Sequence, residues 1–468
     1  MMNCWKGLYY LAFFFFSLAL TSLASASVLD FDTFRLGNGR DTVLVIGGIQ
    51  GDEPGGFSAA NLLATHYEIE EGSVWVVPNL NFPSIIKRSR GLYGDMNRKF
   101  AVLDEKDPEF ATVRRIQELI DDPAVKLVLN LHDGSGYYRP SYEDSLRNPS
   151  RWGQSVIIDQ ELLPNTDFMA ELNQAAEQAA YAANAGLLRD IHKVHVHNTR
   201  TVEGDREMEK SLSYYAVRQN KAAFGLEASK ELPVAERTYY HLRMIEEFLR
   251  MAGVKFKRSF ELSPAGIDKA LKENLGVSFA GNRIFLPLDN ARKNINFLPL
   301  AKNGLERPIT SKPIMAVVPC DKEKGALCVH YGNRLISIIR PSWHDTEENL
   351  DAMRVMVDGK EKLAPFGQII NVSEDIKILR EPGFRVNAIG FDKGLKDESE
   401  VKLKLRDFEK RFSLDKDGSL FRVEVYKGDN FAGMFLIFFE NKALNKEKNM
   451  AGRGFSPAES SKESSLGY

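Results

Sequence analysis

One apolar run that breaks into glycines constrains the fold of this chain more than any other feature. Residues 42–49 read Thr-Val-Leu-Val-Ile-Gly-Gly-Ile, and Gln50 and Glu53 follow in a loop rich in glycine. A β-branched run of this kind predicts a buried strand that ends in a tight loop. Two polar side chains three positions apart on such a loop can converge on one point, so both are candidate functional groups.

A second apolar run, residues 125–131, is followed directly by His132. An imidazole from one strand end and two oxygen ligands from another suit a zinc site that keeps one position open for water. We therefore predict Gln50, Glu53 and His132 as ligands of Zn²⁺, although a histidine would be the usual residue in place of Gln50. Each segment alone also fits a structural role, because glycine-rich loops and single histidines are common.

The first residues have the pattern of a secretory signal peptide. Lys6 precedes an apolar core over residues 7–20, and Ala24-Ser-Ala26 provides small residues at a cleavage site. The alternative is an uncleaved membrane anchor, but the apolar stretch is short for a membrane span. We therefore expect cleavage after Ala26, a periplasmic mature protein and no stable membrane span after cleavage.

Composition excludes some classes of partner. The chain has 468 residues with 43% hydrophobic and 27% charged residues, values typical of a soluble globular protein of two or three domains. The formal net charge of −2 gives no electrostatic footprint for nucleic acid.

From residue 28 to about residue 252 the sequence alternates between strand-like and helix-like stretches. Such alternation predicts an α/β fold with a mixed or parallel central sheet flanked by helices. Functional groups in these sheets gather outside the carboxyl ends of the strands, where Gln50, Glu53 and His132 are expected. The predicted strands are residues 42–47, 73–78, 125–131, 154–158 and 221–228, and the predicted helices are residues 55–66, 108–121, 168–187, 205–219 and 233–252.

The sequence changes character after about residue 253. A short helix over residues 264–275 precedes many apolar runs separated by polar turns, which predicts a β-rich C-terminal half. We divide this half into two β-rich domains, residues 253–342 and 343–444. The polar tail, residues 445–468, is predicted to be disordered.

Two cysteines, Cys320 and Cys328, flank a charged turn suited to joining two strands. An exported chain can oxidise them to a disulfide, and two buried free thiols are the equal alternative.

Two further segments place polar groups near strand ends. The first contains Arg88, Arg90 and the motif Asp-x-Asn-Arg over residues 95–98, which can recognise a carboxylate and polarise a carbonyl. A solvated basic loop is its alternative interpretation. The second contains Glu227 at the end of an apolar strand, where a carboxylate can move a proton between water and a leaving amine. A glutamate bound to a neighbouring loop is the commoner case for a single Glu.

The four motifs follow one another as Gln-x-x-Glu, Asp-x-Asn-Arg, Leu-His-Asp-Gly and Gly-Leu-Glu, over roughly residues 40–252. This order resembles the zinc metallocarboxypeptidases, whose pattern is His-x-x-Glu, Asn-Arg, His and a late catalytic Glu. The resemblance implies that Glu53 and His132 are zinc ligands and that Gln50 replaces the first ligand histidine. It also implies that the substrate's terminal carboxylate is bound by Asn97 and Arg98, that the scissile carbonyl is polarised by Arg90 or else Arg88, and that the general base and acid is Glu227.

The glutamine in place of histidine, the signal peptide and the β-rich C-terminal half are closest to one branch of this family. That branch is the exported peptidoglycan DL-carboxypeptidases that set cell shape in helical bacteria. The resemblance implies trimming of a muropeptide tripeptide to a dipeptide with release of meso-diaminopimelate. It also makes peptidoglycan peptides, and other cell-wall enzymes, the candidate partners.

Two alternatives were weighed against this interpretation. One is a non-catalytic peptidoglycan-peptide binding protein, in which Gln50 marks a degraded metal site. The other is a related zinc N-acyl amino acid deacylase. The intact Glu227 argues against the first, and the signal peptide argues against the second.

Several polar residues close to these motifs are less clearly assigned. Asp133 is placed in the lining of the substrate pocket. Tyr214 and Tyr215 lie where the family usually has a tyrosine, but within a predicted helix, and receive no role. The alternation along residues 191–197 predicts a partly exposed strand, in preference to a second metal site, for His192, His195 and His197.

Overall fold

The computed structural model describes most of the chain, namely residues 29–164, 166–302, 308–391 and 393–440. The predicted signal peptide, residues 1–26, and the predicted tail, residues 445–468, lie outside the described residues. Among the helices that the structure describes, none combines the length and the apolar character needed to cross a membrane.

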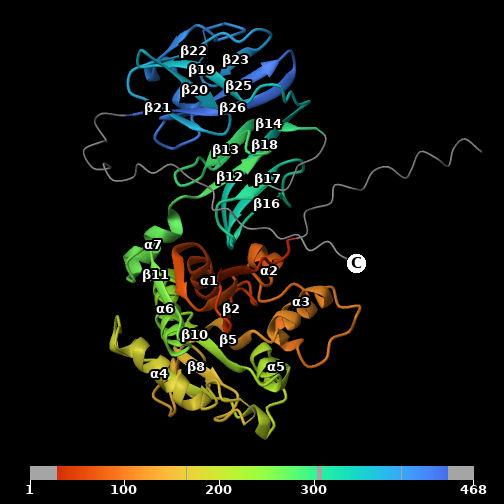
Figure 1. Cartoon of the computed structure of the whole chain (residues 1–468), viewed down its shortest axis with the longest axis vertical. Coiled ribbons are helices and arrows are strands. Elements are labelled where there is room, and N and C mark those ends of the chain that lie inside the picture. Colours follow the sequence, from red (N-terminus) through yellow and green to blue (C-terminus); the bar gives the residue numbers. More distant parts are fainter. Residues whose placement is uncertain (1–28, 165, 303–307, 392, 441–468) are drawn as a thin grey trace, which may run out of the picture. The chain divides into compact units, whose positions relative to one another are not determined.

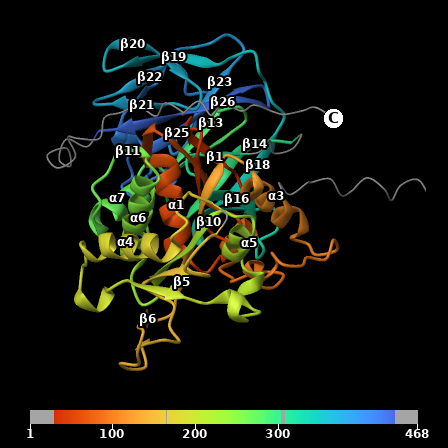
Figure 2. The same cartoon turned by 60° about the horizontal axis from the view of Figure 1, so that its bottom comes forward.

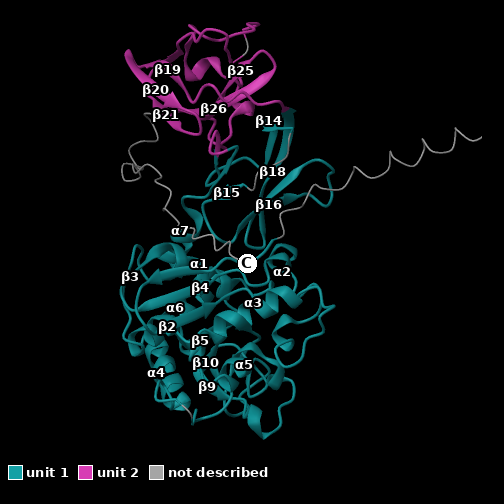
Figure 3. Ribbon diagram, turned by 45° about the vertical axis from the view of Figure 1, so that its right-hand side comes forward, with its two compact units in different colours: residues 1–280, 286–343 teal, residues 281–285, 344–468 magenta. Residues whose placement is uncertain are grey.

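The chain divides into two compact units (Figure 3). The first unit comprises residues 1–280 and 286–343, and the second comprises residues 281–285 and 344–468. The residues that were assigned to a first β-rich domain, 253–342, thus lie mainly in the same unit as the α/β sheet.

A seven-stranded mixed sheet forms the centre of the first unit. Its inner strands β4, β2, β5 and β10 run parallel, while β1 and β8 are antiparallel to their inner neighbours. This arrangement confirms the predicted fold class. In order across the sheet the strands are β1 (Phe34–Gly37), β4 (Ser73–Val77), β2 (Thr42–Ile46), β5 (Val125–Gly134), β10 (Ala222–Ser229), β8 (Ser155–Ile158) and β9 (His195–Asn198).

Helices cover both faces of this sheet, as inner strands that are buried on both faces require. Helices α1, α4 and α6 lie on one side and α3 and α5 on the other (Figures 1 and 2). Phe224 of β10 packs against Phe248 of α6 with ring centroids 4.4 Å apart. The helices are α1 (Pro54–His66), α2 (Phe82–Lys87), α3 (Phe110–Asp121), α4 (Leu172–Asn184), α5 (Leu212–Arg218), α6 (Val234–Met251) and α7 (Pro264–Lys272).

Two predicted helices are shorter than expected. The stretch 205–219 contains only a 3-10 turn, η4 (Met208–Lys210), and then α5. The reason is local, since the side chain of Ser211 accepts a hydrogen bond from the amide of Tyr214 and so begins α5 there. The predicted helix 168–187 is α4, which starts at Leu172. The other 3-10 turns are η1 (Met96–Arg98), η2 (Asp190–His192), η3 (Thr201–Glu203), η5 (Leu405–Asp407) and η6 (Lys410–Phe412).

The predicted strand over residues 191–197 is wrong in its first half. His192 belongs to the turn η2, and only His195 and His197 lie on β9. The imidazole of His192 hydrogen-bonds the Tyr240 hydroxyl at 2.9 Å. The ring of His197 stacks on Tyr138 with centroids 4.0 Å apart. Burial, first of all, lowers the pKa of each of these three histidines to about 4.

The rest of the first unit is mainly β-structure. Strands β16 and β17 form an antiparallel hairpin, and a disulfide joins Cys320 to Cys328 across it. The disulfide alternative of the sequence analysis is therefore the observed one. These strands are β3 (Tyr67–Glu71), β6 (Tyr137–Tyr138), β7 (Arg147–Asn148), β11 (Lys255–Arg258), β12 (Gly276–Phe279), β14 (Asn294–Ala301), β15 (Ile309–Thr310), β16 (Met315–Pro319), β17 (Leu327–Tyr331) and β18 (Arg334–His344); β13 (Ile284–Pro287) spans the sequence border between the units.

The second unit consists of two four-stranded sheets around an apolar core. Phe421 and Phe435 are fully buried in this core. Alternation along β25 places Phe421 and Val423 toward the core, as its sequence pattern predicts. The sheets are β20 (Lys360–Pro365), β19 (Ala352–Val357), β22 (Ile376–Ile378), β24 (Lys402–Leu403), and β21 (Ile369–Val372), β26 (Asn430–Phe439), β25 (Leu420–Lys427), β23 (Arg385–Ala388).

Candidate active site

Gln50, Glu53 and His132 meet at the carboxyl edge of the central sheet. Nδ1 of His132 lies 3.1 Å from Oε1 of Gln50 and 3.0 Å from Oε2 of Glu53. The parallel pairing of β2 with β5 brings the loop after β2 beside His132. All three residues are buried. The structure therefore brings together the three side chains that the sequence predicts as metal ligands.

The chemistry of this trio fits a divalent metal ion only if the amide oxygen of Gln50 serves as a ligand. Within the described ranges, no group of three His, Cys, Asp or Glu side chains is placed to hold a metal. Gln50, however, adds a third donor to Glu53 and His132. An amide oxygen, a carboxylate and an imidazole are a suitable donor set for such an ion.

Asp95 holds the Gln50 amide in the orientation that this role requires. Nε2 of Gln50 donates to Oδ1 of Asp95 at 2.8 Å, which leaves Oε1 turned toward His132. The other carboxylate oxygen of Asp95 accepts from Nε of Arg90 at 3.0 Å. Asp95 is the first residue of the Asp-x-Asn-Arg motif, and no role was predicted for it. Its signal was present, since an amide ligand needs an acceptor for its NH2 group.

Glu227 lies beside His132 in the sheet. The sequence placed His132 beyond the end of its strand, but β5 continues to Gly134 and pairs His132 with Glu227 on β10. Side chains at paired positions of neighbouring strands point to the same face. Oε2 of Glu227 is buried without a hydrogen-bond partner among the described residues. Burial, followed by the negative charges of Glu53 and Asp133, raises the pKa of Glu227 well above its usual value.

Two cations flank Glu53 on the side away from His132. Nη1 of Arg90 lies 3.5 Å from Oε1 of Glu53, and Nζ of Lys230 lies 3.3 Å from the same oxygen. The side chain of Arg90 is 49% exposed, so its guanidinium can reach a bound molecule. Lys230 was not predicted, although it stands three positions after Glu227 in the quoted motif.

Arg88 does not join this group. It ends α2 in the left-handed region with φ of 54°, and its Nε donates to the backbone carbonyl of Asn333. Arg90 is therefore the arginine that the structure brings to the candidate ligands, while Arg88 faces the hairpin turn after β17.

Asn97 and Arg98 lie on the turn η1 next to His132. Nδ2 of Asn97 is 3.5 Å from Nε2 of His132, and its Oδ1 accepts from the amide of Leu212 at 2.9 Å. Nη1 of Arg98 donates to the Asn97 carbonyl at 3.0 Å, and its Nε lies 3.7 Å from Glu207. Both side chains thus stand at the edge of the site, with Arg98 the more exposed.

Asp133 has a different place from the predicted pocket lining. Its carboxylate is fully buried and accepts from the amide of Gly55 at 2.8 Å, from Arg237 at 3.2 Å and from His241 at 3.1 Å. Burial opposes ionisation, but the hydrogen bond and charge of His241 and the charge of Arg237 lower the net pKa of Asp133. Asp133 therefore ties β5 to α1 and α6.

The two unassigned tyrosines lie on α5, as expected. The hydroxyl of Tyr215 donates to Asp121 at 2.8 Å, so this group is engaged at the surface of α3. Tyr214 packs against the core of the first unit. Neither contact places a tyrosine hydroxyl beside the candidate ligands.

Comparison with known proteins identifies the family of this chain. Residues 1–272 match the family described as "Carboxypeptidase controlling helical cell shape catalytic", and residues 346–440 match a "C-terminal domain of metallo-carboxypeptidase". The chain belongs to this family of carboxypeptidases. It is an enzyme, a metallo-carboxypeptidase, and the family implies a metal cofactor. The family resemblance inferred from the four motifs is confirmed.

Solved structures of one bacterial protein are similar over most of the chain. The apo form of cell shape determinant Csd4 from Helicobacter pylori is 39% identical, covers 88% of this chain and 100% of its own, and has a TM-score of 0.82. The tripeptide-bound form gives the same values. The mDAP-bound form, described as a D,L-carboxypeptidase, is 40% identical over 87% of this chain and 100% of its own, with a TM-score of 0.82. Comparison with curated protein sequences gave no match.

Proposed function

We propose that this protein is an exported, zinc-dependent D,L-carboxypeptidase that trims peptidoglycan tripeptides to dipeptides and releases meso-diaminopimelate, with an effect on cell shape. The observation that carries the proposal is the convergence of Gln50, Glu53 and His132 beside Glu227. Support for the substrate class comes from Csd4 of Helicobacter pylori, which binds a tripeptide and mDAP in its solved structures. Other cell-wall enzymes remain proposed partners.

The metal would be held by Gln50, Glu53 and His132, whose donor atoms already converge. When bound, the ion supplies Lewis acidity for the scissile carbonyl and for the attacking water. The amide of Gln50 is a neutral and weaker donor than an imidazole, so Asp95 is important for keeping that amide in place.

Glu227 is the residue that moves the proton. Its buried Oε2 has no partner among the described residues and is therefore available to a water or a leaving amine. As the base it takes a proton from the attacking water, and as the acid it delivers that proton to the departing nitrogen.

Three side chains would bind and orient the peptide. Arg90 is placed to stabilise negative charge on the carbonyl oxygen, because it already borders Glu53 and remains half exposed. Arg98, supported by Asn97, would bind the free carboxylate at the end of the substrate. This division explains why one arginine lies against the metal ligands and the other at the rim.

The substrate is tested by incubating the purified protein with defined tripeptide and pentapeptide muropeptides. We expect release of meso-diaminopimelate from the tripeptide, loss of that activity with a chelator, and recovery with added zinc. Release from neither peptide by the zinc-loaded protein would reject the proposed substrate.

Gln50 provides the test of the metal site. Gln50→Ala should abolish zinc binding or reduce activity severely, whereas Gln50→His should keep zinc with altered activity, because imidazole is a stronger donor in a changed position. Bound zinc and turnover are measured together. Unchanged zinc and full activity in Gln50→Ala would remove Gln50 from the ligand set.

Export is proposed from the sequence pattern alone. Amino-terminal sequencing of the protein from a periplasmic fraction should begin after Ala26. A retained Met1 on that protein would reject cleavage.

A further inference from the structure

Helix α2 carries the loop that contains Arg90 and also touches the loop that contains Gln50. Arg88 caps α2, and Arg90 follows two positions later. On the inner side, a Cβ at Gly51 would lie 2.1 Å from the carbonyl carbon of Ser84, so the α2 backbone and the Gln50 loop are in direct contact. A displacement of α2 would therefore shift both the loop that carries Gln50 and the segment that carries Arg90.

The hairpin formed by β16 and β17 packs against the other side of α2. We call residues 315–331 the brace hairpin. A hydrophobic cluster separate from the main core joins α1, α2 and this region. The side-chain amide of Asn79 also donates, through Nδ2, to the backbone carbonyl of Pro313, just before β16, at 3.1 Å. The buried members of the cluster are Phe57, Phe82, Ile85, Ile86, Ile314 and Ala316.

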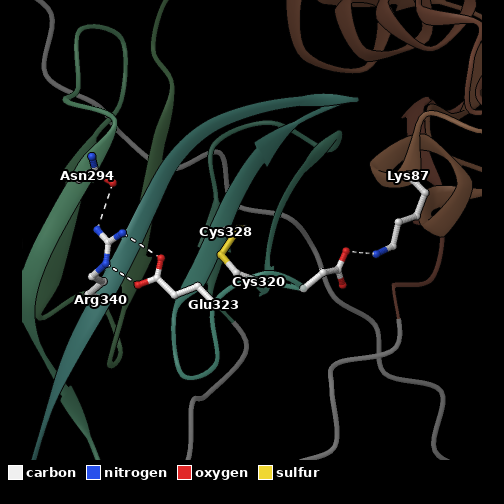
Figure 4. The surroundings of a disulfide bond; sticks show 7 residues. Lys87, Asn294, Cys320, Glu323, Cys328 and Arg340 are labelled. Atoms are coloured by element: carbon white, nitrogen blue, oxygen red, sulfur yellow. Dashed lines mark hydrogen bonds and ion pairs between the residues drawn. A yellow bond between two sulfur atoms is a disulfide. The ribbon is translucent and has the colours of Figure 1, made fainter.

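Polar contacts fix the end of α2 to the same region. Lys87, the last residue of α2, forms an ion pair with Asp321, and Arg88 donates to the carbonyl of Asn333. Asp321 stands in the loop that the disulfide closes, and Figure 4 shows Lys87 on one side of that disulfide and Arg340 with Glu323 on the other. The covalent link restricts the loop that presents Asp321 to α2.

Packing between these two elements is incomplete. A cavity of about 200 Å³ lies at the C-terminal turn of α2, and its walls include Pro83 and Ile86 of α2 and Val318 and Cys328 of the brace hairpin. The end of α2 is held by the hydrophobic cluster together with the ion pair, the Arg88 contact and the disulfide-closed loop.

We propose that the brace hairpin positions Arg90 for catalysis, with Lys87 and Asp321 as positioning residues. This inference rests on the proposed function for the role of Arg90. Arg90 is 49% exposed and pairs with Asp95 and Glu53, and its backbone follows the cap of α2 by two residues, so a shift at the end of α2 moves Arg90 relative to these partners. A displacement of about 1 Å in a catalytic group can lower a rate by up to about 100-fold.

Two carboxylates on the disulfide loop provide a matched test. Asp321→Asn removes the contact with α2, while Glu323→Gln neutralises a carboxylate that pairs with Arg340 of β18 at 2.9 Å. Because the Lys87–Asp321 pair is exposed, we expect Asp321→Asn to lower kcat about two- to fivefold with a smaller change in KM. Glu323→Gln should leave kcat unchanged, and exchanging the charges as Lys87→Asp with Asp321→Lys should restore it.

A larger effect is expected from removing the covalent link. Cys320→Ser with Cys328→Ser should lower kcat by about tenfold at a temperature where the protein remains folded. If the brace acts through Arg90, its effect should largely disappear in an Arg90→Lys background, because the two changes then share one cause. Additive effects of the two changes on kcat would overturn the proposal.

Hydrogen exchange gives a readout that does not depend on activity. Amides of residues 88–98 should exchange faster in Asp321→Asn and in the double serine variant than in the wild type or Glu323→Gln. Equal exchange in all four proteins, or equal kcat in Asp321→Asn and the wild type, would overturn the brace. If the variants exchange faster as expected but the wild-type protein releases no amino acid from the peptides, the proposed function is rejected and the brace is retained.

Discussion

Each unit buries a glutamate whose pKa is raised, yet the two carboxyl groups have different neighbours. In the first unit, Oε2 of Glu227 has no partner among the described residues. In the second unit, Oε2 of Glu424 accepts from the Tyr426 hydroxyl at 2.8 Å, and Oε1 lies 3.5 Å from Arg422. Burial is the first cause of the raised pKa in both. Oε1 of Glu424, like Oε2 of Glu227, is buried without a hydrogen bond among the described residues. Neither a raised pKa nor such an oxygen therefore marks a catalytic carboxyl by itself; Glu227 is distinguished by its place beside His132 and Glu53.

The largest expected effect separates these two glutamates. Glu227→Gln keeps the shape of the side chain but removes the base, so kcat should fall by about 100- to 10,000-fold while zinc stays bound. Glu424→Gln should leave kcat unchanged and alter only the thermal midpoint. Activity on the tripeptide and bound zinc are measured for both. Loss of zinc from Glu227→Gln would make Glu227 a ligand, and equal losses of activity in both variants would end the contrast.

The second effect concerns the rim of the site. Arg98→Ala removes a charged partner for the substrate's free carboxylate, so kcat/KM should fall by on the order of 100-fold. A peptide with an amidated C-terminus should show the same loss with the wild-type protein. Arg422→Ala, in the second unit, serves as the comparison and should affect stability without lowering kcat/KM. Equal turnover of the free and amidated peptides would contradict the role of Arg98.

A third effect compares two carboxylates with lowered pKa values. Burial opposes the lowered pKa of Asp95, and the hydrogen bond from Gln50 and the charge of Arg90 outweigh it. Asp95→Asn should weaken zinc affinity by about 10- to 100-fold, as loss of a group that orients a ligand typically does. Asp397→Asn is the control, because the pKa of Asp397 is also lowered but its hydrogen-bond partner is Ser399 in the second unit. Zinc affinity that is the same in Asp95→Asn and the wild type would remove Asp95 from the support of Gln50.

The smallest effect is a difference in acid stability. Burial lowers the pKa of four histidines of the first unit to about 4. A group whose folded pKa is depressed contributes stability above its unfolded pKa of about 6.5, and that contribution is lost as pH falls toward about 4. The first unit should therefore lose a few degrees of thermal midpoint over this range, measured calorimetrically on the whole chain. A second unit that melts earlier at pH 5 would contradict this. The four histidines with a lowered pKa are His66, His192, His195 and His197.

The strand ends of the site were predictable, whereas its supports were not. Gln50, Glu53 and His132 follow apolar runs, and parallel strands bring such ends together. The helix α2 was missed because it is only six residues long, too short for a periodic apolar pattern to appear. The continuation of β5 through His132 was missed because polar residues do not extend an apolar run. Its pairing with Glu227 satisfies the backbone there all the same.

The contacts of Asp133 show a further limit of prediction from the sequence. Asp133 accepts hydrogen bonds from His241 and from Gly55, which lie 108 and 78 positions away in the sequence. No local sequence pattern relates residues so far apart. Asp133 was placed in the pocket because it follows His132, yet alternation along β5 turns adjacent side chains to opposite faces. Sequence order therefore located the donors, while the tertiary contacts decided which neighbours face them.

One carboxylate links the two halves of the chemistry. Asp95 accepts from the Gln50 amide with one oxygen and from Arg90 with the other. On the proposed function, a metal ion held by Gln50 would favour one position of Asp95, and a peptide bound by Arg90 would favour the same position from the opposite side. Such coupling is thermodynamically reciprocal, so whatever factor the ion adds to peptide affinity the peptide must add to ion affinity. A weakly held ion in the resting enzyme would then be retained most firmly while substrate is present.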